Sequence, residues 1–148
     1  MPQFMPGALF RIPVEDDHAY ALMLSKPGYV AFYGKDVEFD EAGAPAGPPL
    51  FTVLVTDPTY SGRKWGKPIR MVSADELPRI PKFFRQTATG ANLRIVDPEA
   101  GRVASARRED LEGLEQEGAW TADHIKSRIL DAYAGRPNLF AESLKPRL

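Results

Sequence analysis

The sequence contains no cysteine. This absence excludes a disulfide framework, a thiolate nucleophile, an iron–sulfur cluster and every zinc site with cysteine ligands. The chain also lacks a run of about 20 apolar residues, which a membrane-spanning helix would need. Residues 1–6 have no basic cluster followed by an apolar stretch, so they do not resemble a signal peptide. We therefore expect a cytoplasmic protein that neither spans a membrane nor leaves the cell.

An excess of charge of one sign is absent too. The chain has 19 lysines and arginines against 20 aspartates and glutamates, which gives a formal net charge of −1. Proteins dedicated to nucleic acids usually carry a basic excess, because neutralising phosphates supplies much of their affinity. We therefore do not expect nucleic acid to be the partner.

What the chain does contain is the composition of an ordinary folded protein. Of its 148 residues, 43% are hydrophobic and 26% are charged, and this length and balance are typical of one globular domain. We therefore expect a single domain over residues 1–148. The 14 prolines and 12 glycines predict many turns and few long helices.

The first two-thirds of the chain has the pattern of antiparallel strands. Over residues 8–14, alternate positions place Phe10, Ile12 and Val14 on one face of a strand. Pro13 has no N–H to donate, so we expect it at an edge or at the end of that strand. Further strands are predicted at residues 18–24, 29–33, 50–56, 69–72, 82–86, 92–96 and 102–106.

The C-terminal part has a helical pattern at about residues 121–134. Thr121 is a good N-cap, and the apolar residues Ile125, Ile129 and Tyr133 recur every four positions. This stripe is expected to pack on the strands. The predicted fold is therefore mainly β within the α+β class: a bent antiparallel sheet or small open barrel, closed by one C-terminal helix.

The only histidines, His18 and His124, are the first candidates for chemistry. His18 follows two aspartates, and a carboxylate beside an imidazole suits metal binding or acid–base catalysis. His124 shares a predicted helix face with Arg128 and Asp131. We favour a polar hairpin turn for the first group and a helix surface contacting loops for the second. No catalytic motif, metal ligand or cofactor site is predicted, although a small enzyme that uses both histidines and nearby carboxylates remains an alternative.

A second alternative comes from residues 60–70, where four basic residues surround Trp65. Basic residues around an aromatic ring are typical of proteins that bind single-stranded nucleic acid. Since the chain has no net basic charge, we favour a connecting segment with Trp65 anchored in the core. A single-strand nucleic-acid-binding barrel module is kept as the alternative.

The long loop predicted at residues 34–49 has the most distinctive surface chemistry. It is rich in glycine and proline, and four carboxylates lie within six positions around one phenylalanine. An acidic loop steers towards a basic cleft, and long loops in compact proteins are often functional. Residues 109–117 add five more carboxylates. The candidate partner-binding residues are Asp36, Glu38, Phe39, Asp40 and Glu41.

Several segments resemble a known family. Residues 6–14 read as a glycine followed by a strand with an aromatic residue, Ile-Pro and an aliphatic residue. The next strand contains Tyr20 and is followed by the aliphatic and aromatic residues 29–33, and residues 119–133 have a tryptophan before a helix that contains His-Ile-x-x-Arg. Together these segments resemble the immunity protein 26 family of bacterial polymorphic-toxin systems.

The resemblance implies a β-rich immunity protein that binds and neutralises a cognate protein toxin. It brings no catalytic residue and no cofactor. Since the sequence shows no signal peptide, we expect that toxin to act in the cytoplasm, on nucleic acid, a nucleotide cofactor or the translation machinery.

Overall fold

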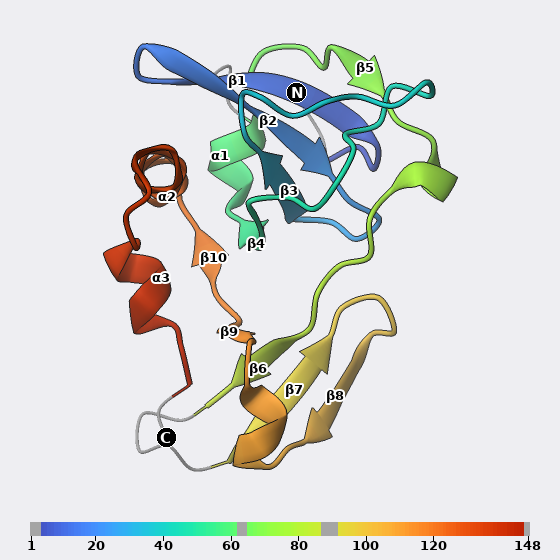
Figure 1. Cartoon of the computed structure of the whole chain (residues 1–148). Coiled ribbons are helices and arrows are strands. Elements are labelled where there is room, and N and C mark those ends of the chain that lie inside the picture. The colour runs from blue at the N-terminus through green and yellow to red at the C-terminus, as the bar shows by residue number, and fades with distance from the viewer. Residues whose placement is uncertain (1–3, 62–64, 87–91, 147–148) are drawn as a thin grey trace.

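The computed structural model describes residues 4–61, 65–86 and 92–146 (Figure 1). These residues form ten strands in two sheets, three α-helices and two short 3-10 turns, η1 (Ala74–Glu76) and η2 (Arg108–Leu111). The α+β class and the dominance of β structure, both predicted from the sequence, are confirmed.

The larger sheet has six strands in the order β10-β4-β3-β2-β1-β5. Neighbouring strands are antiparallel, except that β10 runs parallel to β4. Its strands are β1 (Ala8–Val14), β2 (Asp17–Met23), β3 (Tyr29–Tyr33), β4 (Phe51–Val55), β5 (Arg70–Met71) and β10 (Ala119–Trp120). Strand β2 lies inside the sheet, between β3 and β1.

The smaller sheet has four strands in the order β8-β7-β6-β9 and lies below the larger one in Figure 1. Its strands are β6 (Phe83–Arg85), β7 (Arg94–Asp97), β8 (Arg102–Ser105) and β9 (Glu115–Gln116), with β9 parallel to β6. The division into two mixed sheets differs from the single antiparallel sheet or open barrel expected from the sequence. The two parallel pairings come from β9 and β10, which at two residues each are too short to give a strand pattern.

The three helices are α1 (Asp57–Ser61), α2 (Ala122–Ala134) and α3 (Leu139–Ser143). Helix α2 matches its prediction: the Thr121 hydroxyl accepts a hydrogen bond from the His124 N–H at 3.5 Å, and Gly135 ends the helix at a φ of 71°. Two corrections concern the other helices. One turn of helix, α1, lies where only a connection was expected, and the short α3 follows α2, so the C-terminal part has two helices.

The larger sheet is buried on both faces. Helices α1 and α2 pack on one face of the sheet. The apolar residues of β1 that were predicted to share one face lie on that same side. On the other face lie the loop between β3 and β4 and the smaller sheet, whose Phe83 ring is 5.8 Å from that of Tyr29. The sheet is therefore the central layer of the molecule.

Pro13 occupies the kind of position that was predicted. It pairs with His18 near the end of β1, whereas the edge strand β5 pairs only with Ala8 and Leu9. The carbonyl of Leu9 accepts a hydrogen bond from Ile69 on the β5 side. Since alternate residues of a strand point their polar groups to the same side, the missing N–H of Pro13 faces the open edge of β1.

Candidate partner-binding surface

The loop between β3 and β4, residues 34–50, folds back on itself by hydrogen bonds of its own. The backbone N–H groups of Asp40 and Ala46 donate to the carbonyls of Ala44 and Glu38, at 2.9 and 2.8 Å. The Asp40 carboxylate also accepts from the Ala44 N–H at 3.0 Å. Proline and glycine prevent a regular strand here, yet the loop contains one isolated bridge, between Phe39 and Pro45.

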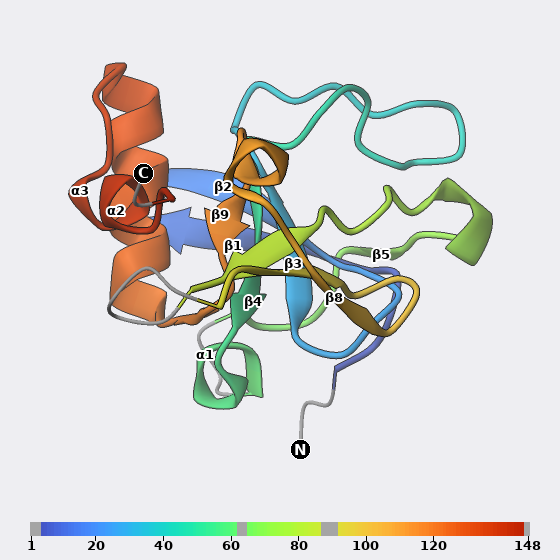
Figure 2. The ribbon, with the colours of Figure 1, turned by 90° about the horizontal axis from the view of Figure 1, so that it is seen from below.

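The tip of this loop is anchored on the larger sheet, on the opposite face from α1 (Figure 2). Ala44 is buried in the cluster that includes Tyr33 and Leu22. Next to it, Gly43 has a φ of 83°, and a Cβ there would lie 1.7 Å from Nη1 of Arg70. Only glycine suits this backbone conformation and this close approach. The loop is therefore a fixed surface feature attached at its tip.

All five candidate residues of the loop are exposed to solvent. Phe39 is 40% exposed, and its ring meets that of Tyr20 edge to face at 5.2 Å. The carboxylates of Asp36, Glu38 and Glu41 form no hydrogen bond or ion pair with the other described residues, whereas that of Asp40 is held by the loop backbone. Three accessible acidic groups thus lie on the same loop as an accessible aromatic ring.

A cleft of about 650 Å³ separates the loop from the C-terminal end of α2. We call it the loop–helix cleft. Its main side chains are Tyr33, Lys35, Asp36, Glu38, Leu50 and Tyr133. Asp36 and Glu38 line the cleft, whereas Phe39, Asp40 and Glu41 lie outside it. The candidate residues therefore divide into a cleft pair and an outer group.

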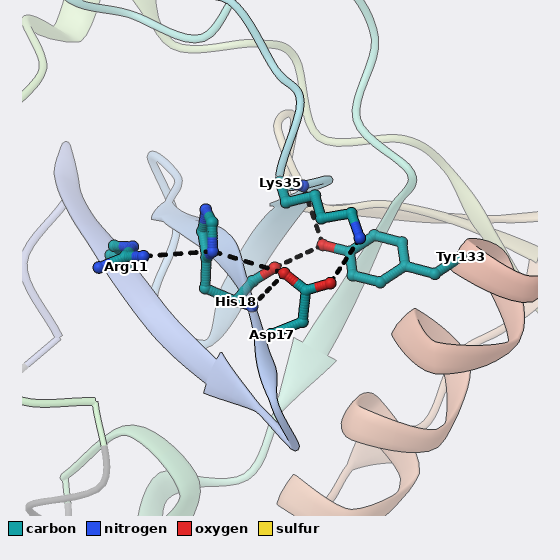
Figure 3. Close-up of polar contacts among 5 residues, drawn as sticks. All are labelled: Arg11, Asp17, His18, Lys35 and Tyr133. Atoms are coloured by element: carbon teal, nitrogen blue, oxygen red, sulfur yellow. Dashed lines mark hydrogen bonds and ion pairs between the residues drawn. The ribbon is translucent and has the colours of Figure 1, made fainter.

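Tyr133 joins three parts of the chain beside this cleft (Figure 3). Its hydroxyl donates a hydrogen bond to the His18 carbonyl at 2.7 Å and accepts one from the Lys35 N–H at 2.9 Å. The Lys35 ammonium lies 5.0 Å from the centre of the Tyr133 ring. The end of α2, the start of β2 and the start of the loop are thereby held together. Burial raises the pKa of the Tyr133 hydroxyl.

The Asp17 and His18 pair is a structural part of the β1–β2 hairpin, as the sequence favoured. The Asp17 carboxylate accepts from the His18 N–H and binds the Lys35 ammonium, and these two contacts lower its pKa. Nδ1 of His18 lies 3.6 Å from the Asp17 carboxylate and 3.3 Å from a guanidinium nitrogen of Arg11. Because a guanidinium can only donate, Nδ1 is the acceptor of that contact.

The two histidines do not form one site. His124 packs its ring against those of Phe140 and Trp120, with centroids 4.0 and 6.3 Å away. It lies in the first turn of α2, whereas His18 contacts Tyr133 in the last turn. Because a helix rises about 1.5 Å per residue, these ends of α2 are about 14 Å apart. Among the residues that the structure describes, no three histidines, aspartates or glutamates are placed to hold a metal ion.

The other two residues of the predicted helix face make structural contacts. Arg128 donates to both oxygens of the Glu115 carboxylate, at 3.0 and 2.5 Å. Asp131 accepts from Arg136 at 3.0 Å and from Asn138 at 2.9 Å. This face of α2 therefore connects to β9 and to the segment before α3.

Trp65 is only 8% exposed and packs against Phe10 and Tyr60, with ring centroids 5.5 and 6.4 Å away. The prediction that it is a core anchor is confirmed, and its ring does not present a face for stacking bases. Two of the four basic residues around it, Arg63 and Lys64, lie outside the described residues.

The second acidic segment, residues 109–117, has fewer accessible charges than the loop. Glu115 and Glu117 are paired with Arg128 and Arg85, and the Asp110 carboxylate accepts from a backbone N–H at the start of η2. This segment mainly serves internal contacts, and the loop has the more accessible carboxylates.

Sequence reasoning missed the cleft itself. Tyr33 and Tyr133 were assigned to a strand and to an apolar helix stripe, and both assignments hold. No local pattern indicates that these residues, 100 positions apart, line one cleft with the acidic loop. That arrangement depends on where α2 docks.

The fold and the site together define an α+β protein with an exposed acidic loop. Comparison of the chain with protein-family models, with curated proteins and with solved structures finds no match in any of the three. Among the described residues, no helix has the length and apolar character needed to cross a membrane.

Proposed function

We propose that the chain is an immunity protein that binds and neutralises a cognate bacterial toxin through the β3–β4 loop. The observation that carries this proposal is that the unpaired carboxylates of Asp36, Glu38 and Glu41 and the exposed ring of Phe39 lie on one loop. Acidic groups of this kind accelerate association with a basic partner. An aromatic side chain at the centre supplies apolar contact area, as interface hot spots do.

The choice of a toxin as partner rests on the resemblance of residues 6–14, 29–33 and 119–133 to the immunity protein 26 family. A toxin that attacks nucleic acid or nucleotides carries a cationic cleft to hold its substrate, and a loop with unpaired carboxylates is complementary to such a cleft. The expected toxin acts in the cytoplasm, where the antidote is also expected.

Protection of cells tests this proposal. The protein is co-expressed with a candidate toxin, taken as the product of the gene next to its own, either unchanged or with Glu38→Lys and Glu41→Lys. Both glutamates are exposed and unpaired, so the variant should fold normally. We expect it to lose protection.

The matched control is Glu109→Lys with Glu112→Lys, which makes the same change in net charge at two exposed positions outside the loop. We expect this control to protect as well as the unchanged protein. Equal protection by both variants would refute the assignment of the loop, and no protection by the unchanged protein would refute the immunity function.

The alternative, an enzyme that uses His18 and His124, has no geometric support, since the His18 ring contacts Arg11 and Tyr20 whereas the His124 ring packs on Phe140. We expect the variant with both His18→Asn and His124→Asn to keep its protective effect. A folded variant that still binds the toxin but no longer protects would favour the enzyme.

A further inference from the structure

We propose that the loop–helix cleft receives an arginine side chain of the protein partner. The inference rests on the proposed function, because it assigns the chemistry of the partner at the same surface. It concerns the cleft pair, Asp36 and Glu38, and not the outer group of the loop.

The charge of the cleft favours a cation. Asp36 and Glu38 line it and form no ion pair with the other described residues. Lys35 is the one basic residue of the lining, and its ammonium is bound by the Asp17 carboxylate. Two negative charges are therefore left without a paired cation, and a positive group from a partner would provide it.

A buried tyrosine also points to a hydrogen-bond donor as the occupant. Tyr33 lines the cleft, is only 2% exposed, and forms no hydrogen bond with the other described residues. No buried side-chain oxygen or nitrogen of these residues lacks a partner, so the Tyr33 hydroxyl must reach solvent, and we assign that contact to the cleft it lines. Burial raises the pKa of this hydroxyl, so it stays protonated, and the lone pairs of its oxygen can accept a hydrogen bond.

The number of hydrogen-bond acceptors among the lining residues favours a guanidinium as the cation that the cleft binds. A guanidinium has five N–H donors in a plane and no acceptor, which matches two carboxylates and a hydroxyl oxygen arranged around one cleft. Guanidinium groups also stack on aromatic faces, and the ring of Tyr133 lies in the lining. The cleft volume of about 650 Å³ is within the usual range of about 300–1,000 Å³ for sites that enclose a small group.

The test uses N-acetyl-arginine methylamide as the probe and backbone amide NMR of the whole chain as the readout. We expect saturable shifts for residues 34–38 and 46–50 and for the last turn of α2. The citrulline analogue, which is uncharged but has almost the same shape, should give none. The lysine analogue should bind more weakly, because its ammonium is a point charge with three donors.

Two variants of equal charge separate the cleft from the loop as a whole. Asp36→Asn with Glu38→Gln should weaken binding of the arginine probe at least about tenfold, since two charge-assisted hydrogen bonds are lost. Asp40→Asn with Glu41→Gln, outside the cleft, should change it less than about twofold. The asparagine at position 40 keeps an oxygen for the Ala44 N–H.

The inference is overturned by the absence of saturable shifts, by equal binding of the citrulline or lysine analogue, or by equal weakening in both variants. These outcomes are independent of the protection assay. If the protein protects cells but does not bind the probe, only the assignment of the cleft to arginine is refuted. If the protein binds the probe but does not protect cells, the proposed function is refuted and the assignment of the cleft to arginine stands.

Discussion

At the scale of single residues, the Tyr133 hydroxyl is the polar contact on which the candidate surface depends. It bonds to the His18 carbonyl and to the Lys35 N–H, so it joins α2 to the hairpin and to the loop. Tyr133→Phe removes the oxygen, so the His18 carbonyl and the Lys35 N–H lose this partner and can bond only to water. We expect the free energy of unfolding to fall by about 1–2 kcal/mol, measured by urea denaturation.

Tyr20→Phe is the matched control for that change, because the Tyr20 hydroxyl forms no hydrogen bond with the other described residues. Its stability should stay within about 0.5 kcal/mol of the unchanged protein. If Tyr133→Phe were equally neutral, the hydroxyl would not be what attaches the loop to α2.

The buried tyrosines predict how the protein responds to alkali. Burial raises the pKa of Tyr29, Tyr33 and Tyr133 above the ordinary 10.0, and burial with a hydrogen bond to Asp57 raises that of Tyr60 to about 12. A raised pKa means that the folded state holds the proton more tightly. The stability that results is complete below pH 10 and is lost as the pH rises through the raised values.

We therefore expect the free energy of unfolding to decrease between about pH 10 and pH 12. The phenolate absorbance of the folded protein should rise at higher pH than that of the urea-unfolded chain. Coincident titration curves in the two states would contradict the raised pKa values of these four tyrosines.

At the scale of elements, α2 is held on the sheet by Ile125 and Ile129, which are 3% and 0% exposed. Ile129→Ala removes buried methyl groups and leaves a cavity, so it should destabilise the protein by about 2–5 kcal/mol. Ile69→Ala is the control, since Ile69 is 56% exposed. Thermal denaturation of both should show a clear decrease only for Ile129→Ala, and equal melting would mean that α2 is peripheral.

The contact of α2 with β9 depends on Arg128. Its guanidinium binds the Glu115 carboxylate and lies 4.3 Å from the centre of the Phe51 ring. Glu115→Gln leaves this arginine, of which only 15% is exposed, without its counter-charge. We expect a loss of about 1–3 kcal/mol in urea denaturation.

The control for Glu115→Gln is Glu142→Gln. Glu142 pairs with Lys145 on the surface, where an ion pair contributes about 0–1 kcal/mol. A loss at Glu115 no greater than that at Glu142 would show that the Arg128 contact is as weak as a surface pair.

At the scale of the whole molecule, the sequence predicted the elements better than their assembly. The strands of residues 8–33 and helix α2 have strong periodic patterns and clear caps, and they occur where expected. The split into two sheets depends on β9 and β10, whose two-residue strands have no period to detect. Tyr133 packs beside Ile125 and Ile129 as the stripe predicted, but it is only half buried, and its hydroxyl bonds to the loop.

The candidate surface was predictable only in part, because local patterns indicate exposure but not how distant segments pack together. The exposure of the loop carboxylates and of Phe39 follows from local composition. The cleft does not, since it depends on how α2 packs beside a loop about 90 positions earlier in the chain. The burial of Trp65 was predictable only from the absence of a net basic charge on the whole chain.

The central claim is that the acidic loop is the surface that meets a basic partner protein. The most direct measurement is the association rate constant with the purified candidate toxin, at low and at physiological ionic strength. For Glu38→Lys with Glu41→Lys, we predict an association rate constant at least about tenfold lower at low salt and a weaker dependence on salt, with an unchanged fold. Glu109→Lys with Glu112→Lys should associate like the unchanged protein. An unchanged rate constant in the loop variant would contradict the account and move the interface away from the loop.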